Sequence, residues 1–169
     1  MNANYKKGLR IAVLLVTSLL IASVSAATYY TMFMGADVGI TGNEVIFVEG
    51  TDWGSSTMGG GAQSVALILA GDAGAITTVS DPVRIHNSGA GAHNLNLKLD
   101  TWDGESETEL NYIHVTVYND VSGGSAQGDT IELVPGGADV TETGSISIPS
   151  AGADWRVEWV IYWKDTATT

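Results

Sequence analysis

From residue 28 onward the chain consists of short segments in which apolar and polar residues alternate, and this pattern constrains the fold more than any other feature. The clearest example is 154–165, DWRVEWVIYWKD, in which one side carries Trp155, Val157, Trp159, Ile161 and Trp163. Alternation with a period of two is typical of a β-strand with one buried face, whereas an amphipathic helix repeats its apolar residues every three to four positions. Helical periodicity is almost absent after residue 27.

Other segments of the same kind are separated by Gly, Ser and Asp, which favour turns. They cover 44–50, 64–71, 75–80, 82–89, 93–102, 111–120, 129–137 and 144–152. Roughly eight or nine strands in one domain of ordinary length, with alternating faces, predict two antiparallel sheets packed over one core. The expected fold class is therefore all-β, an antiparallel β-sandwich.

The first 26 residues have the composition of an export signal. Basic residues at the start precede an apolar run from Ile11 to Val24, and small residues follow at 25–27. The run is shorter than the ~20 residues that span a membrane, so we expect cleavage after Ala26 or Ala27 and only a transient membrane contact. Two alternatives stay open, an uncleaved anchor and a prepilin-type cut near Gly8 that would retain the apolar helix.

Cleavage would leave a strongly acidic chain. After residue 26, four basic residues (Arg84, Lys98, Arg156 and Lys164) stand against all 19 acidic residues, a formal charge near −15. Such a surface repels nucleic acid and anionic lipid head groups, so neither is expected as a partner. The sequence contains no cysteine, which excludes disulfide bonds in an exported protein, so its stability must come from the core, from bound ions or from assembly.

Recognisable catalytic motifs are absent. There is no Gly-x-Ser-x-Gly sequence, and the glycine-rich stretch 58–65 lacks the lysine of a phosphate-binding loop, so we expect no enzyme. His86 and His93 flank an expected turn, NSGAGA, and His114 lies within a strand. With no cysteine, these three histidines form no transition-metal motif.

One acidic stretch, LDTWDGESETEL at 99–110, is the candidate for an ion site. Calcium takes several oxygen ligands from a loop, and Asp100, Asp103 and Glu105 could supply them. The alternative is a solvated acidic turn. No cofactor besides this candidate calcium ion is expected.

The segment directly behind the signal is itself patterned as a strand. Within 28–41 the even positions from 30 onward are apolar without a break: Tyr30, Met32, Met34, Ala36, Val38 and Ile40. Such a strand either folds back into its own domain or adds to the sheet of another copy. Burial of six apolar side chains at ~1.5–3 kcal/mol each is comparable with the cost of ordering the segment, so the energetics permit both. Gly35, Gly39 and Gly42 would let the segment swing away from the domain.

The layout resembles the TasA/camelysin group of bacterial biofilm-matrix proteins and the archaeal bundling pilins. The similar features are the short signal, the strand directly behind it, the strand–turn–strand VRIHNSGAGAHNLNLKL at 83–99 and the aromatic closing strand WRVEWVIYW at 155–163. The resemblance implies a jelly-roll-like sandwich with a protruding N-terminal donor strand, which polymerises by donor-strand complementation and has no catalytic residue. The chain lacks the long helical insertions and abundant lysines of the bacterial members, so their partner proteins do not carry over.

We therefore expect a signal peptide at 1–26, a donor strand at 27–42 and a β-sandwich domain at 43–169. The expected function is that of a structural subunit of a secreted cell-surface filament, a pilus or biofilm-matrix fibre, whose partner is another copy of itself. Two alternatives stay open. One is a monomeric secreted module that binds glycans or a surface layer through Trp53 or Trp102, and the other is a type IV pilin-like subunit with a retained helix.

Overall fold

The computed structural model describes residues 28–37, 44–54, 56–103, 109–134, 139–150 and 152–165, and it describes only the backbone of 28–37 and 100–103. These residues form β1 (Thr28–Asp37), β2 (Val45–Glu49), β3 (Thr57–Met58), the short 3-10 helix η1 (Gly60–Ala62), β4 (Ser64–Gly71), β5 (Ile76–Asn87), β6 (His93–Asp103), β7 (Leu110–Tyr118), β8 (Ala126–Leu133), β9 (Ile146–Ile148) and β10 (Ala153–Trp163). The expected signal peptide lies outside the described residues. Within them, no helix has the length and apolar character that crossing a membrane requires.

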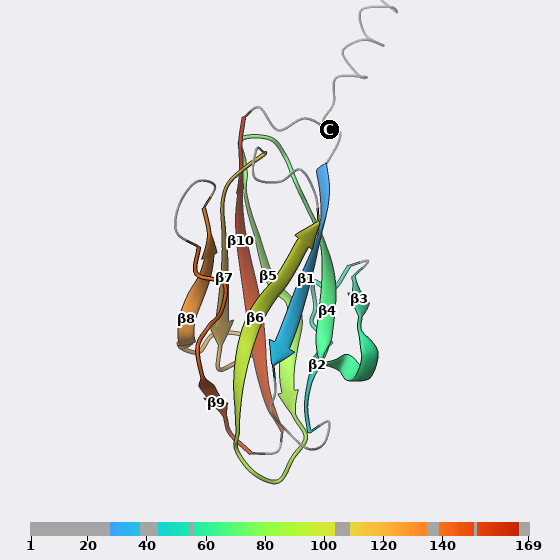
Figure 1. Ribbon diagram of the computed structural model, residues 1–169, viewed down its shortest axis with the longest axis vertical. Helices are drawn as coiled ribbons and strands as arrows, with labels where there is room; N and C mark the ends of the chain where they lie inside the picture. Colours follow the sequence, from blue (N-terminus) through green and yellow to red (C-terminus); the bar gives the residue numbers. More distant parts are fainter. Residues whose placement is uncertain are drawn as a thin grey trace, which may run out of the picture.

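The strands form two five-stranded sheets, in the orders β3-β4-β1-β6-β9 and β2-β5-β10-β7-β8 (Figure 1). Every pair of neighbouring strands is antiparallel. The all-β, sandwich-like character expected from the sequence is thus confirmed. The segments 75–80 and 82–89, expected as two strands, form the single strand β5, which bulges opposite Val157 and Trp159 of β10.

The core follows the alternation seen in the sequence. Along β10, each odd position from Trp155 to Trp163 is buried and each even position from Arg156 to Tyr162 is only half-buried. This strand lies third in the second sheet, between β5 and β7, and its three tryptophan side chains are buried in the core. Large apolar residues are concentrated here because the central strand has the deepest position to fill.

One side of the sandwich is closed by the segment between β8 and β9. The N–H of Leu99 in β6 donates to the carbonyl of Thr141 (2.9 Å), while the N–H groups of Asp129 and Glu132 in β8 donate to carbonyls of Thr143 (2.9 Å) and Val140 (2.8 Å). The segment 140–143 thus bonds to both sheets. Gly128 makes this close approach feasible, since it has a φ of +68° and a Cβ there would lie 2.5 Å from the Thr143 carbonyl oxygen.

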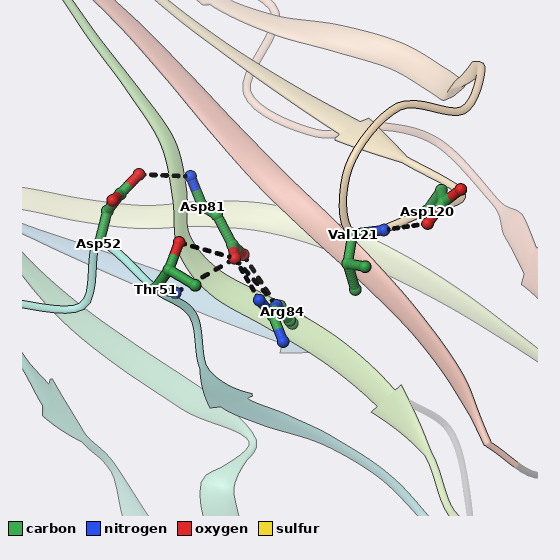
Figure 2. Close-up of polar contacts among 6 residues, drawn as sticks. All are labelled: Thr51, Asp52, Asp81, Arg84, Asp120 and Val121. Atoms are coloured by element: carbon green, nitrogen blue, oxygen red, sulfur yellow. Dashed lines mark hydrogen bonds and ion pairs between the residues drawn. The ribbon is translucent and has the colours of Figure 1, made fainter.

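At the edge formed by β2 and β5, a buried aspartate ties the loop after β2 to the bulge of β5 (Figure 2). Asp81 is 5% exposed. Its carboxylate accepts hydrogen bonds from Thr51 N–H and Thr51 Oγ1 (both 3.1 Å) and from Arg84 Nε (2.9 Å), and it forms an ion pair with Arg84 Nη2. The N–H of Asp81 in turn donates to Asp52 Oδ2 at 3.0 Å. The carboxylate and the backbone N–H of Asp81 are therefore both paired.

This cluster predicts a specific response to acid. Burial raises the pKa of Asp81, but the hydrogen bonds and charge of Arg84 and the bonds from Thr51 lower it by more, so the pKa lies below its ordinary value of 3.8. A depressed pKa in the folded state contributes stability that is present above about pH 4 and lost as the pH falls through the folded-state pKa. We expect Asp81→Asn to reduce the free energy of unfolding at pH 7 by about 1–3 kcal/mol.

The measurement is denaturant unfolding of both chains between pH 7 and pH 2. The difference in unfolding free energy between wild type and Asp81→Asn should shrink as the pH falls below about 4, because Asp81 then becomes protonated in the wild type. A difference that stays constant across this range would show that the charge of Asp81 contributes nothing to stability.

Candidate subunit interface

The strand that comes first in the described chain lies at the centre of its sheet. β1 pairs with β4 from Thr28↔Gly71 to Gly35↔Ser64, and with β6 from Thr31↔Asp103 to Asp37↔Asn96. In the single chain, therefore, β1 does not protrude but is integrated into its own domain (Figure 1). This is one of the two arrangements that the sequence left open.

β4 and β6, the two neighbours of β1, cannot pair with each other through the antiparallel hydrogen bonds that each now makes with β1. β1 is antiparallel to both β4 and β6, so β4 and β6 run in the same direction. Removal of β1 would leave two parallel edges separated by the width of one strand, and a parallel pair uses a different, slanted hydrogen-bond pattern. We call the space between β4 and β6 the acceptor groove. It requires an antiparallel strand.

The register of β1 matches the alternation in its sequence. Tyr30, Met32 and Met34 lie directly opposite Leu69, Leu67 and Val65 of β4, which are all 4% exposed or less. On the other side, Met34 and Ala36 lie opposite Leu99 and Leu97 of β6, both buried. Residues directly opposite in an antiparallel ladder share a face, so these four even positions belong to the core side of the sheet. The remaining two candidate donor residues, Val38 and Ile40, lie outside the described residues.

A bulge fixes the position of β1 within the acceptor groove. The ladder between β1 and β6 changes register between Phe33 and Met34, where β6 contributes the extra residue Asp100. A bulge pins a ladder because a shifted strand would no longer match it. The acceptor groove thus selects one register.

The domain that follows the strand has its own anchor. The N–H of Ser88 donates to the carbonyl of Glu44 at 2.7 Å, and Nε2 of His93 lies 2.8 Å from Oε2 of Glu44. β2 then pairs with β5, beginning at Val45↔Asn87. These contacts hold Glu44 and β2 to β5, to the β5–β6 turn and to the start of β6 without involving β1. β2 is thus anchored independently of β1.

The expected turn between the histidines is confirmed as the connection between β5 and β6, which passes from one sheet to the other. Asn87 is fully buried, its Nδ2 donates to the carbonyls of Gly91 (2.9 Å) and Pro149 (2.6 Å), and its Oδ1 accepts from the N–H of Gly89 (2.9 Å). This side chain satisfies the backbone of a tight turn and joins it to the β9–β10 connection. A buried residue with all of these bonds has a structural role.

The candidate calcium ligands are only partly within the described chain. The backbones of Asp100 and Asp103 belong to β6, which runs one residue beyond the expected strand 93–102, while Glu105 lies outside the described residues. Among the described side chains, no group of three or more His, Asp or Glu residues is placed to hold a metal ion. A calcium site at these three residues stays a prediction.

Each histidine contacts a carboxylate: His86 Nδ1 lies 2.6 Å from Asp154 Oδ1, and His114 Nε2 lies 3.2 Å from Glu132 Oε1, in addition to the contact of His93 with Glu44.

The two tryptophans considered for glycan binding differ in how far the structure describes them. Trp53 is half-buried and packs against the core, and the side chain of Trp102 is outside the description.

A comparison with protein-family models finds no match for this chain, and a search among curated proteins finds no significant relative. The functional argument therefore rests on the residues and on the place of β1 in the sheet.

Proposed function

We propose that the protein is the structural subunit of an extracellular filament, which polymerises when β1 of one subunit enters the acceptor groove of the next. One observation carries the proposal: the first strand of the described chain fills the centre of a sheet between two strands that are parallel to each other. A central strand at the end of a chain can be exchanged between copies without threading the rest of the domain.

Strand exchange preserves the contacts that the single chain makes. The same ladder pairs and the same opposition to Leu67 and Val65 would form with a donated strand, so the free energy of the inserted strand is nearly equal in both arrangements. The balance then depends on the connection between β1 and β2 and on protein concentration. Gly39 and Gly42 within this connection support an extended course, because glycine adopts turn and extended conformations at little steric cost.

The proposal includes the finer features of the fold and the location. We infer a jelly-roll type of sandwich, which is supported by consecutive strands that change sheet, such as β4 to β5 and β5 to β6, and by first and last strands at the centres of the two sheets. Secretion is supported by the composition of residues 1–26. A homopolymer, with no catalytic residue, is the form of assembly that this arrangement favours.

Electron microscopy and sedimentation of the full chain, exported and processed by its own cell, test the proposal. We expect filaments whose fraction rises with protein concentration, because each joint is bimolecular. A processed wild-type chain that sediments as a stable monomer at every concentration, and shows no fibres, would overturn the filament proposal and leave β1 as an ordinary internal strand.

A further inference from the structure

The outer face of the second sheet carries an exposed aromatic cluster that the filament proposal does not use. Tyr162 of β10 lies directly opposite Ile76 of β5 on one side and Tyr112 of β7 on the other. Ile76 is 59% exposed, whereas Ile161 and Trp163 on either side of Tyr162 are buried. Opposite residues share a face, so Ile76, Tyr162 and Tyr112 form one row across three strands.

The next row extends this surface. Val160 of β10 lies opposite His114 of β7, and His114 lies opposite Glu132 of β8. We call Ile76, Tyr112, His114, Val160 and Tyr162 the aromatic platform. All five are at least partly exposed, and Glu132 stands at its margin with a side chain that is 46% exposed.

The rings of the aromatic platform support one another. The Tyr112 and His114 rings stack with centroids 4.4 Å apart and an interplanar angle of 17°, and Tyr162 meets Tyr112 edge-on at 5.5 Å. Nε2 of His114 lies 3.2 Å from Oε1 of Glu132. Mutual packing and this polar contact limit the rotamers of the rings, so a ligand would lose little affinity through ordering them.

Three properties of this surface restrict what can bind there. β5, β10 and β7 are internal strands whose two neighbours already pair with them, so a peptide cannot add as a further strand. The aromatic platform consists of five residues, whereas a stable protein interface takes about 20–30 residues, or about 800 Å², on each partner. The formal charge near −15 of the processed chain also opposes polyanions.

We propose that the aromatic platform binds a neutral oligosaccharide. The C–H face of a sugar ring packs on an aromatic ring, and its hydroxyls can donate to the Glu132 carboxylate or exchange hydrogen bonds with the phenols of Tyr112 and Tyr162. From Ile76 to Tyr112 the row spans two strand spacings, roughly 10 Å, which suits a short run of sugar units rather than a single ring. The site would be available in monomer and filament alike, because it lies on the sheet opposite to the acceptor groove.

The test is a titration of the processed full chain with soluble hexasaccharides of glucose, mannose and N-acetylglucosamine, and with a hexasaccharide of uronic acids as the anionic comparison. At least one neutral sugar should bind and the anionic one should bind more weakly. Tyr112→Ala and Tyr162→Ala should each lower the affinity about tenfold, the upper range for loss of one aromatic contact. Tyr112→Phe should stay within about threefold of wild type, since it keeps the ring.

Tyr118→Ala is the matched control. Tyr118 lies on the same face of β7, under the guanidinium of Arg156 (3.9 Å to the ring centroid), but outside the aromatic platform. Its replacement should leave sugar binding unchanged, and circular dichroism should show all four variants folded. If no neutral sugar binds, or if binding survives both Tyr112→Ala and Tyr162→Ala, the proposal is wrong, whatever the outcome for filaments.

Discussion

A chain carrying Met32→Asp will form no filaments. Met32 lies opposite Leu67, which is 0% exposed, so the substitution places a carboxylate on the core side of the first sheet with no described cation opposite it. A buried, unpaired charge typically costs about 4 kcal/mol or more, which is enough to expel β1 from any acceptor groove. Electron microscopy of the exported variant, and its melting temperature beside that of wild type, measure the effect.

Thr31→Asp is the control for this prediction. It introduces the same charge one position earlier, opposite Ile68, which is 38% exposed, so filaments should persist. A synthetic peptide of residues 28–41 should raise the melting temperature of the Met32→Asp chain, because it fills the groove, yet it should not restore fibres, because it carries no domain. Fibres of normal length from the Met32→Asp chain would contradict an assembly that depends on the even face of β1.

Much of the sandwich could be predicted from local patterns in the sequence. The alternation in 154–165 predicted the buried row of β10, and the turn signal NSGAGA predicted the turn between β5 and β6. These features depend on neighbours in sequence, where the period of two and the preference of glycine and asparagine for turns are sufficient. The even face of the first strand was likewise visible, and its register opposite Leu67 and Val65 agrees with it.

Pairing between segments that are distant in the sequence could not be predicted from local patterns. The segment 140–143 lies between two expected strands and has no strand pattern, yet it bonds to β6 and β8 because both have unpaired backbone groups on that side. The aromatic platform joins Ile76, Tyr112 and Tyr162, which only the register of three strands brings together. Sequence reasoning therefore selected Trp53 and Trp102 as glycan candidates, since isolated aromatic residues carry no signal of their cross-strand neighbours.

The acidic stretch shows the same limit. The expected strand ended at residue 102 and left Asp103 in the acidic turn, but β6 extends to Asp103 through its pairing with β1. The partner strand overrides the local preference, as is common for β structure. Asp100 lies within the expected strand, but its place as the extra residue of the bulge that fixes the register of β1 depends on the pairing with β1.

Oxidation of a Thr31→Cys, Ile68→Cys chain will distinguish a donated strand from a strand that stays in its own domain. The N–H of Ile68 donates to Ser56 Oγ at 3.2 Å, on the side of β4 that faces β3. The backbone N–H and C=O groups of Ile68 therefore point away from β1. Thr31 and Ile68 are therefore a non-hydrogen-bonded pair, in which Cα atoms lie about 4.5 Å apart, within the range that a disulfide bridges. The sequence has no other cysteine, so the engineered pair reports without interference.

In filaments the disulfide should join neighbouring subunits, so a non-reducing gel should show a ladder of covalent multimers that collapses to one band on reduction. In a chain oxidised before assembly, the disulfide should form within one molecule and block polymerisation. Reduction of that disulfide should restore polymerisation. The single variants Thr31→Cys and Ile68→Cys are the controls and should give no ladder. If every disulfide in material taken directly from fibres is intramolecular, then β1 remains in its own domain and the subunits join through another surface.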